Sequence, residues 1–319
     1  MTRSILLTGG LGYVGGRVAE WLSKDPDLEI FVTSRNPASA EVPGWVTKDH
    51  CIKLDILNDD DVKNSCEDID IIVHFVALNE IDSIKDPGKA LLINGLGTQK
   101  IVKAAETAGV TRFIYLSTAH IYRSPLEGTI TETTLPRPIH PYAISHRTAE
   151  DFVLAASQQG KFQGIVLRLS NSIGVPINSK VDRWSLIGND LCRQAITTKE
   201  MRLKTAGNQE RDFITLYDVA RAVSHMIQLP DDRIGDGIFN LGGENSLSIN
   251  EVATKIQERC NQKFHFTPSI VHLATSSKEI CVPLKYSIEK LKSTGFIPMG
   301  SLEREIDNTL IFCQKHYPS

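Results

Sequence analysis

The sequence predicts an α/β protein, in which a doubly wound parallel sheet is followed by a smaller, mixed α/β C-terminal lobe. Three features of the 319-residue chain favour this fold. Apolar, β-rich runs alternate with segments of helical length, a glycine-rich turn joins the first run to the first helix, and the alternation ends after Asn171. Such alternation is typical of βαβ units, which build parallel sheets with helices on both faces.

The expected strands are short apolar runs rich in β-branched residues, at Ile5–Thr8, Ile30–Thr33, Cys51–Leu54, Ile71–Phe75, Phe113–Ser117 and Ile165–Leu169. The expected helices lie between them, at Val14–Leu22, Asp59–Cys66, Ala90–Ala108 and Tyr142–Ser157. Parallel sheets of this kind bind ligands at the carboxyl ends of their strands. We therefore expect the functional residues in the loops that follow the strands.

The turn after the first expected strand has the features of a phosphate-binding site. Gly9 permits a tight turn, Gly12 lets a pyrophosphate approach the backbone, and Gly15 lets the helix pack closely on the strand. The unpaired N–H groups of the helix N-terminus would face the phosphates. The turn therefore predicts a dinucleotide ligand, although glycines in such a turn can also serve chain geometry alone.

These features divide the chain into two parts. We expect a dinucleotide-binding domain at residues 1–170 and a substrate-binding lobe at residues 171–319, because Pro176, Asn178 and Ser179 open a region of short, mixed elements. Residues 211–230 are expected to return to the first domain.

Composition and charge favour a small-molecule ligand over a macromolecular one. Hydrophobic residues at 41% and charged residues at 23% are typical of a globular protein. A net charge of −3, with scattered Lys and Arg residues, provides no basic stripe for nucleic acid. The longest apolar stretch, Ile69 to Leu78, is interrupted by Asp70 and His74 and is too short to span a membrane.

The cysteines and histidines show no pattern of a disulfide or metal framework. The six cysteines lack CxxC pairs, the nine histidines lack compact ligand spacing, and the chain starts without a signal-peptide pattern. We therefore expect reduced thiols in a cytoplasmic protein, with no membrane, nucleic acid or metal ion as a partner.

A series of motifs occurs in a characteristic order along nearly the whole chain: TGGLGYVGG from Thr8, KLDI from Lys53, VHFVA from Val73, LLINGLGTQKIVKAA from Leu91, YLSTAHIY from Tyr115, PYAISH from Pro141, LRLSNSIGVP from Leu167 and RDFITLYDVA from Arg211. In this order the chain resembles the extended short-chain dehydrogenases/reductases of the nucleotide-sugar epimerase/dehydratase type, which have a Rossmann fold. The resemblance implies an NAD(P)-dependent oxidoreductase or epimerase. Its implied ligands are a nicotinamide dinucleotide and a nucleotide sugar.

The resemblance also assigns site residues. The cofactor-binding residues it implies are Gly9, Gly12, Tyr13, Val14, Gly15, Ser34, Arg35, Asp55, Ile56, Val76, Ala77, Asn94, Tyr142 and His146. The implied catalytic residues are Thr118, Tyr142 and His146, and the implied substrate contacts are Thr118, Asn171 and Arg211. Arg211 could instead form an ion pair with Asp212, and Trp184 could stack on a base but is more typical of a core residue.

Tyr142 and Thr118 resemble the pair that exchanges the hydroxyl proton and polarises the oxygen during hydride transfer. The family pattern is Tyr-x-x-x-Lys, whereas this chain has His146 in place of the lysine. A lysine lowers the tyrosine pKa, while a histidine is largely neutral near pH 7. We therefore expect a site biased toward ketone reduction, unless His146 simply replaces the hydrogen bond of the lysine to the ribose.

The end of the second expected strand indicates the cofactor. NAD-dependent proteins usually have an acidic residue there, whereas this chain has Ser34 followed by Arg35. An arginine attracts the 2′-phosphate of NADP, so we expect NADP rather than NAD, unless Arg35 is merely solvated.

The residues after Thr118 bear on the reaction. The 4,6-dehydratase relatives have two acidic residues there, and this chain has Ala119 and His120. Dehydration is therefore not expected, although His120 could shuttle a proton or only line the pocket. The leading hypothesis is an NADP-dependent reductase of a 4-keto deoxysugar nucleotide; the alternatives are a 4-epimerase and a catalytically weak dinucleotide-binding protein. By resemblance we expect a homodimer formed through the helices Ala90–Ala108 and Tyr142–Ser157.

Overall fold

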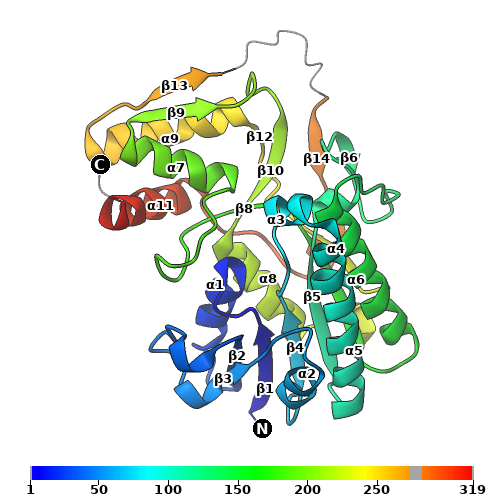
Figure 1. Ribbon diagram of the computed structural model, residues 1–319. Coiled ribbons are helices and arrows are strands. Elements are labelled where there is room, and N and C mark those ends of the chain that lie inside the picture. The colour runs from blue at the N-terminus through cyan, green and yellow to red at the C-terminus, as the bar shows by residue number, and fades with distance from the viewer. Residues whose placement is uncertain (1, 274–281, 318–319) are drawn as a thin grey trace.

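The computed structural model describes residues 2–273 and 282–317 of the chain. Its main sheet has seven strands in the order β11-β7-β5-β4-β1-β2-β3, and all neighbouring strands are parallel (Figure 1). The strands are β1 (Arg3–Thr8), β2 (Leu28–Ser34), β3 (Cys51–Lys53), β4 (Ile71–His74), β5 (Arg112–Thr118), β7 (Gln163–Leu169) and β11 (Ile238–Leu241). The predicted strands and the doubly wound fold are thereby confirmed.

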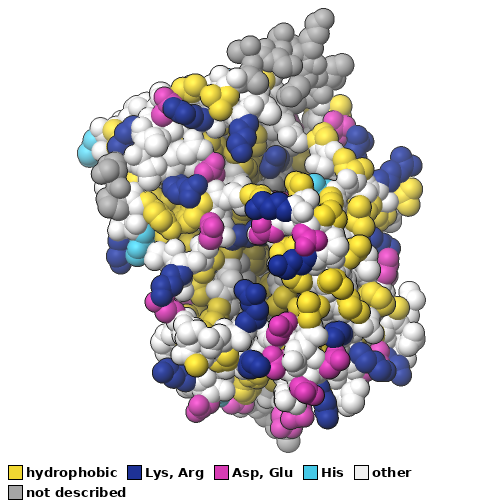
Figure 2. Space-filling model, viewed as in Figure 1, with side chains coloured by type: hydrophobic (Ala, Val, Ile, Leu, Met, Phe, Trp, Pro, Cys, Tyr) yellow, Lys and Arg dark blue, Asp and Glu magenta, His cyan; other side chains and the backbone are white. Residues whose placement is uncertain are grey.

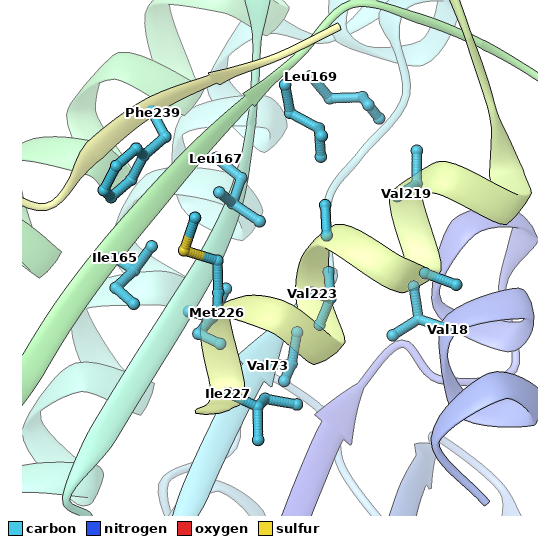
Figure 3. Close-up of a cluster of buried hydrophobic side chains, with 14 of the residues drawn as sticks. Val18, Val73, Ile165, Leu167, Leu169, Val219, Val223, Met226, Ile227 and Phe239 are labelled. Atoms are coloured by element: carbon cyan, nitrogen blue, oxygen red, sulfur yellow. The ribbon is translucent and has the colours of Figure 1, made fainter. Parts of the chain in front are cut away.

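Helices cover both faces of this sheet. One face packs against α1 (Tyr13–Leu22) and α8 (Leu216–Gln228), and the other against α2 (Asp59–Ser65), α5 (Gly97–Ala108) and α6 (Pro141–Gln158). Figure 3 shows Met226 of α8 beside Ile165 and Leu167 of β7, while Val219 lies farther along the helix toward Val18 of α1. The second face has its own buried cluster, so each side of the sheet is closed by apolar packing.

Strand β1 shows why the apolar runs form the centre of the sheet. Ile5, Leu6 and Leu7 have no exposed surface. Ile5 and Leu7 belong to the cluster under α1 and α8, while Leu6 belongs to the cluster on the opposite face. This alternation is the two-residue period of a strand, and a run without polar residues is what a strand buried on both faces requires.

The order of the strands creates a crevice at the carboxyl edge of the sheet. From β1 the chain proceeds to β2 and β3 on one side, and then crosses to β4 on the other. The loops after β1 and β4 therefore diverge, which is the usual place for a ligand in an open parallel sheet. Thr8 and His74 are paired across this point at the ends of the two strands.

The expected helix Ala90–Ala108 is divided in the structure, which corrects that prediction. It begins as α4 (Pro87–Ala90), continues as a π-helix at Leu91–Leu96, and only then becomes α5. The wider π turn places Asn94 inward, where its Oδ1 accepts a hydrogen bond of 2.6 Å from the Leu78 N–H. Periodicity cannot reveal this irregularity, because the apolar residues still recur at helical intervals.

The C-terminal lobe contains two small sheets: β12 (Ser246–Ser248), β10 (Glu210–Thr215) and β8 (Asn171–Ile173) form one, and β13 (Ser269–His272) and β9 (Glu200–Leu203) the other. The lobe also supplies β14 (Leu284–Tyr286), which pairs with β6 (Gly128–Ile130) from the first part of the chain. Its helices α7 (Ile187–Thr197), α9 (Ile249–Phe264) and α11 (Leu302–His316) share a core that includes Trp184. Trp184 is therefore a core residue.

The structure corrects the expected return of residues 211–230 to the first domain. Only the helical half, α8, packs on the main sheet; the strand half, β10, pairs with β8 and β12 in the lobe. A second return, which the sequence did not indicate, is β11, whose parallel pairing with β7 extends the main sheet. Between β7 and β11 the chain first passes through the lobe and then runs along α8, so the short strand Ile238–Leu241 lies outside the regular alternation of strands and helices.

The remaining helices are α3 (Glu80–Lys85) and α10 (Glu289–Ser293), with 3₁₀ turns at Pro37–Ser39, Lys48–His50, Ala119–Ile121 and Asp231–Arg233. In the described ranges, the chain contains no helix with the length and apolarity needed to cross a membrane. Five cysteines are buried free thiols, and Cys281 lies outside the described residues.

Candidate active site

A cavity of about 940 Å³ opens at the carboxyl edge of the main sheet and extends toward the lobe. Figure 2 shows Lys, Arg, Asp and Glu side chains along the hollow between the two parts of the molecule. All but two of the predicted site residues line this cavity: Gly9, Gly12, Tyr13, Val14, Gly15, Ser34, Arg35, Asp55, Ile56, Val76, Ala77, Thr118, Tyr142, His146 and Asn171. The structure therefore gathers residues that end or follow the first five strands of the main sheet in chain order around one space.

The glycine turn forms one wall of the cavity. Gly9 has a φ of +72°, and its N–H donates a hydrogen bond of 3.0 Å to Thr33 Oγ1 on the neighbouring strand. A Cβ atom on Gly15 would lie 2.4 Å from the Gly9 carbonyl oxygen, so only glycine allows α1 to approach the turn. Helix α1 has no side-chain cap at Gly12, which leaves its first N–H groups to a ligand. This wall fits the pyrophosphate of a dinucleotide.

Ser34, Arg35 and Asp55 lie at the end of the cavity formed by β2 and β3. Arg35 is exposed and forms no ion pair with any residue in the described part of the chain. The Asp55 Oδ1 atom accepts a hydrogen bond of 3.0 Å from the Leu57 N–H, which holds the carboxylate at the start of its loop. This end therefore presents an unpaired guanidinium and a fixed carboxylate.

Tyr142 and Thr118 come together where β5 ends and α6 begins. Pro141 occupies the first turn of α6, and the His140 side chain caps the helix by accepting a hydrogen bond from the Tyr142 N–H. Burial raises the pKa of the Tyr142 hydroxyl above its ordinary value, and the Glu80 carboxylate raises it further, against smaller effects of Arg183 and of a hydrogen bond with Thr118. Tyr142 is therefore a neutral phenol at physiological pH.

His146 lies one helical turn beyond Tyr142 and is 2% exposed. Its Nδ1 atom is 2.6 Å from the Tyr115 hydroxyl oxygen, whereas its Nε2 atom has no hydrogen-bond partner among the described residues. Burial lowers the pKa of His146 to about 3, and the nearby His74, Arg183 and His120 lower it in the same direction. The imidazole is therefore neutral, as its sequence context predicted.

Asn94 and Arg211, which were also predicted as site residues, are not among the residues that line the cavity. Asn94 is fully buried and joins the Leu78 backbone to Ser145 Oγ, to which its Nδ2 donates a hydrogen bond of 2.9 Å. It therefore ties the loop after β4 to the helix that carries Tyr142. Tertiary packing sets the direction of a side chain in a π turn, so the sequence motif did not predict where the Asn94 side chain points.

Arg211 is partly exposed and lies within electrostatic range of Glu80 and His120, which both line the cavity. It forms no ion pair with Asp212 in the described structure, because the Asp212 carboxylate accepts hydrogen bonds from Ser170 Oγ and from the N–H groups of Gly243 and Asn245. The alternative of an Arg211–Asp212 ion pair is therefore wrong.

Glu80 and Arg183 line the cavity but were not among the predicted site residues. The Glu80 Oε1 atom lies 3.4 Å from His120 Nε2, so the cavity holds a histidine–carboxylate pair beside Tyr142. Arg183 lies in the loop before α7 and acts electrostatically on both Tyr142 and His146. A charged residue close to a helix start or in a lobe loop gives little signal by itself, since such positions are usually solvated.

The fold and the cavity together define a nucleotide-dependent enzyme of the extended short-chain dehydrogenase/reductase class. The sequence pattern of the NAD dependent epimerase/dehydratase family matches residues 5–242, and the chain belongs to this family. The described residues contain no group of three His, Cys, Asp or Glu side chains that could hold a metal ion.

Individual relatives are distant. The chain is 26% identical to a dTDP-D-glucose 4,6-dehydratase of Mus musculus, over 99% of this chain and 90% of the relative. It is 26% identical to a UDP-glucose 4-epimerase of Rhizobium leguminosarum bv. trifolii, over 82% of this chain and 83% of the relative. A UDP-glucuronic acid 4-epimerase of Bacillus cereus in complex with NAD has the same fold, with a TM-score of 0.82, 21% identity, and coverage of 98% of this chain and 97% of that one.

Proposed function

We propose that this protein is an NADPH-dependent reductase that converts the C4 ketone of a deoxysugar nucleotide to an alcohol. The observation that carries the proposal is the packing of Tyr142 against the buried His146, in which a neutral imidazole occupies the position of the usual lysine. A reduced nicotinamide, when bound, supplies the hydride. The residues of the chain supply the proton, the orientation of the ketone and the nucleotide contacts.

Tyr142 is the proton donor in this proposal. A ketone that receives a hydride becomes an alkoxide, which takes the phenolic proton as the new O–H bond forms; the resulting Tyr142 phenolate regains a proton from solvent before the next turnover. Because burial keeps the Tyr142 hydroxyl protonated, the donor is ready before the substrate binds. Thr118, which interacts with the same hydroxyl, donates a hydrogen bond to the substrate oxygen and holds it beside Tyr142.

The reverse reaction is disfavoured by the same groups. Alcohol oxidation needs Tyr142 as a phenolate base, and a phenolate is stabilised by a nearby positive charge. His146 is neutral, and the Glu80 carboxylate further opposes a negative charge on Tyr142. The site is therefore suited to begin with a neutral phenol and a ketone.

Arg35 supports NADPH as the cofactor. Its unpaired guanidinium is at the end of the cavity where β2 terminates, and an NADP 2′-phosphate offers it a charge-assisted, bidentate hydrogen bond. The Asp55 carboxylate, at the same end, would accept a hydrogen bond from the adenine amino group.

Arg183 and Asn171 support a nucleotide diphosphate as the substrate carrier. Both residues line the lobe side of the cavity, where Arg183 can bind a diphosphate oxygen in the bidentate manner of a guanidinium. Arg211, which lies within electrostatic range of Glu80, adds positive potential to the same region. Two arginines in a partly buried region favour an anionic group over a free sugar.

A 4-epimerase with retained NAD(P) is the alternative within the family, because one of the relatives carries that name. An epimerase must oxidise the C4 hydroxyl before reducing it, so it needs the phenolate that this site disfavours. A 4,6-dehydratase needs an acid and a base beside Thr118, where this chain has Ala119 and His120.

The test is the decrease in nicotinamide absorbance when purified protein and NADPH are mixed with a panel of 4-keto-6-deoxy nucleotide sugars. Consumption of NADPH that depends on the sugar, and is lost by at least about 100-fold in Tyr142→Phe, supports the reductase. Interconversion of C4 epimers without net consumption indicates the epimerase. Nucleotide binding with no turnover of any sugar indicates a catalytically weak dinucleotide-binding protein.

We also propose that two copies of this chain pair through the face that carries α4, α5 and α6. Figure 2 shows hydrophobic side chains gathered to the right of the cavity, on the side where Figure 1 places these helices. Exposed apolar residues on and beside them include Leu91, Leu92, Leu96, Ile144 and Phe152. An apolar helical face of this kind is suited to a bundle with its own symmetry mate. Light scattering after gel filtration measures the mass, and a monomer contradicts the proposal.

A further inference from the structure

Residues 180–183 form a short loop on the lobe side of the cavity. All four of them line the cavity, and in the chain they lie between β8 and α7. The loop carries two positive charges, on Lys180 and Arg183, and one negative charge, on Asp182. The place of the Arg183 guanidinium in the cavity therefore depends on the contacts that hold the two ends of this loop.

One side chain, that of Tyr317, contacts both ends of the loop. Tyr317 follows α11, and its hydroxyl group donates a hydrogen bond of 3.1 Å to the carbonyl oxygen of Ser179. The same hydroxyl oxygen accepts a hydrogen bond of 3.2 Å from the indole N–H of Trp184. Ser179 directly precedes the loop and Trp184 directly follows it, so a single phenol joins the two ends of the segment that lines the cavity.

The two ends of the loop differ in how firmly the rest of the lobe holds them. Trp184 is 5% exposed, and its indole packs edge to face with the Tyr317 ring at 5.3 Å between centroids and stacks with Phe312 of α11 at 6.1 Å. Ser179, in contrast, is exposed. The packed indole therefore fixes one end, and the hydrogen bond from Tyr317 attaches the exposed end to it.

The other contacts of the loop are exposed or local. Lys180 forms an ion pair with Glu41, but both side chains are more than half exposed, and such pairs contribute little to stability. Asn178 accepts hydrogen bonds from the N–H groups of Lys180 and Val181, which shape the turn without attaching it to another element. Within the described part of the chain, the Tyr317 hydroxyl is thus the principal link between the exposed end of the loop and the core of the lobe.

We propose that Tyr317 is a positioning residue, whose hydroxyl clamps residues 180–183 and thereby holds the Arg183 guanidinium where it binds the diphosphate of the nucleotide-sugar substrate. The inference rests on the proposed function, which assigns that contact to Arg183. A guanidinium binds a diphosphate through a planar pair of hydrogen bonds, so a displaced loop loses affinity. The glycine turn belongs to the main sheet and not to the lobe, so NADPH binding should not depend on Tyr317.

The clamp can be measured in the free protein. A two-dimensional ¹H–¹⁵N spectrum shows the indole N–H of each tryptophan, and the signal of Trp184 is the one that neither Trp21→Phe nor Trp45→Phe removes. In Tyr317→Phe we expect this signal to shift and its exchange with solvent to become about fivefold faster, because its acceptor is gone. The signals of Trp21 and Trp45 should stay where they are. A Trp184 signal that is unchanged in Tyr317→Phe overturns the clamp.

Binding of nucleoside diphosphates tests the consequence for Arg183. With UDP, dTDP, GDP and CDP as the probes in isothermal titration, Tyr317→Phe should raise the Kd of the diphosphate that binds best roughly two- to tenfold, as expected for one hydrogen bond. The Kd of NADPH should change less than about twofold. Tyr217→Phe, which removes a hydroxyl on α8 beside Trp21, is the matched control and should change neither value. Equal losses for the diphosphate and NADPH in Tyr317→Phe would show a general effect on the fold and contradict the positioning role.

A double-mutant cycle with Arg183 completes the test. In an Arg183→Ala background, Tyr317→Phe should change the Kd of the diphosphate less than about twofold, because no guanidinium remains to be positioned. An effect of Tyr317→Phe that is the same with and without Arg183 overturns the inference. If none of the four diphosphates binds to the unaltered protein, the proposed substrate carrier fails together with the contact of Arg183, whereas the Trp184 signal still decides whether Tyr317 clamps the loop.

Discussion

The rings of Tyr142 and His146 pack edge to face, with centroids 4.4 Å apart and planes at 63°. The residues lie one turn apart on α6, which is the spacing at which a lysine would bring a permanent positive charge beside the phenol. The imidazole brings no charge, since burial keeps it neutral. Desolvation is therefore the largest influence on the Tyr142 pKa, and the Tyr142 hydroxyl stays protonated beside His146.

Replacing His146 with lysine should reverse this preference. In His146→Lys, an ammonium beside Tyr142 stabilises the phenolate and should lower the Tyr142 pKa by about one to three units. The alkaline limb of ketone reduction, where the donor loses its proton, should move to lower pH by that amount, and alcohol oxidation should become faster at neutral pH. Profiles of kcat/KM against pH in both directions measure the change. His146→Gln, which stays neutral, is the control, and identical profiles for all three proteins would refute the argument.

Replacing Arg35 with aspartate should change the cofactor preference. A guanidinium that binds a 2′-phosphate contributes about 1.5–3 kcal/mol, so Arg35→Asp should raise the Kd of NADPH roughly 10- to 150-fold. The Kd of NADH, which lacks the phosphate, should change less than about threefold. Fluorescence titration of both nucleotides measures the two values. Arg35→Gln removes the charge without adding repulsion and should give an intermediate result; equal losses for NADPH and NADH would disprove the assignment.

The sequence predicted the site far better at the sheet than in the lobe. Gly9, Gly15 and Thr118 are fixed by short-range geometry: a positive φ, a close approach of helix to strand, and the end of a strand. These requirements are visible as residue types at fixed spacing, so the motifs place them correctly. The contact between Tyr142 and His146 on α6 follows from a single helical turn in the same way.

The missed features depend on contacts between distant segments. Glu80 reaches His120 only because α3 and the end of β5 meet at the cavity, a pairing of residues 40 positions apart that leaves no local signal. Asn94 turns away from the cavity because its helix widens into a π turn. Strand β11 joins the main sheet after a long connection through the lobe, so no regular spacing in the sequence predicts this strand. Tertiary packing determines each of these three contacts, and the periodicity of apolar residues in the sequence carries no information about them.

The Glu80–His120 pair gives a prediction about protonation. Burial lowers the pKa of His120, and the Glu80 carboxylate, 3.4 Å away, partly offsets this effect. Glu80→Gln removes the negative charge and should therefore lower the His120 pKa further, by about one unit. An NMR titration of the His120 ring protons measures the shift directly. Glu106→Gln, whose carboxylate pairs with Lys103 on the outside of α5, should leave His120 unchanged. A His120 pKa that is the same with and without Glu80 contradicts the pair.

The stability of the protein should depend strongly on the buried ion pair between Glu150 of α6 and Arg168 of β7. Arg168 on β7 donates hydrogen bonds from Nε to Glu150 Oε1 at 3.1 Å and from Nη2 to Oε2 at 2.8 Å, and both side chains are almost fully buried. Removing one partner leaves an uncompensated charge inside the protein, so Glu150→Ala should lower the free energy of unfolding by about 3–5 kcal/mol. Urea denaturation measures this value. Asp151→Ala, which breaks only the half-exposed ion pair with Arg147, is the comparison and should cost less than about 1 kcal/mol.

A double replacement separates the charge from the packing in the same measurement. The free energy of unfolding lost in Glu150→Ala can be compared with that of the double variant Glu150→Leu, Arg168→Met. If the loss comes from the unpaired, buried guanidinium of Arg168, the double variant should recover a large part of it, because buried ion pairs are often replaced by apolar residues at little cost. The Tyr122 hydroxyl would lose its 2.9 Å hydrogen bond from Arg168 Nη1, but it keeps its bond of 2.7 Å to Asn240 Oδ1. A double variant as unstable as Glu150→Ala would mean that α6 depends on the ion pair as a specific link to β7, and not on the compensation of its charges.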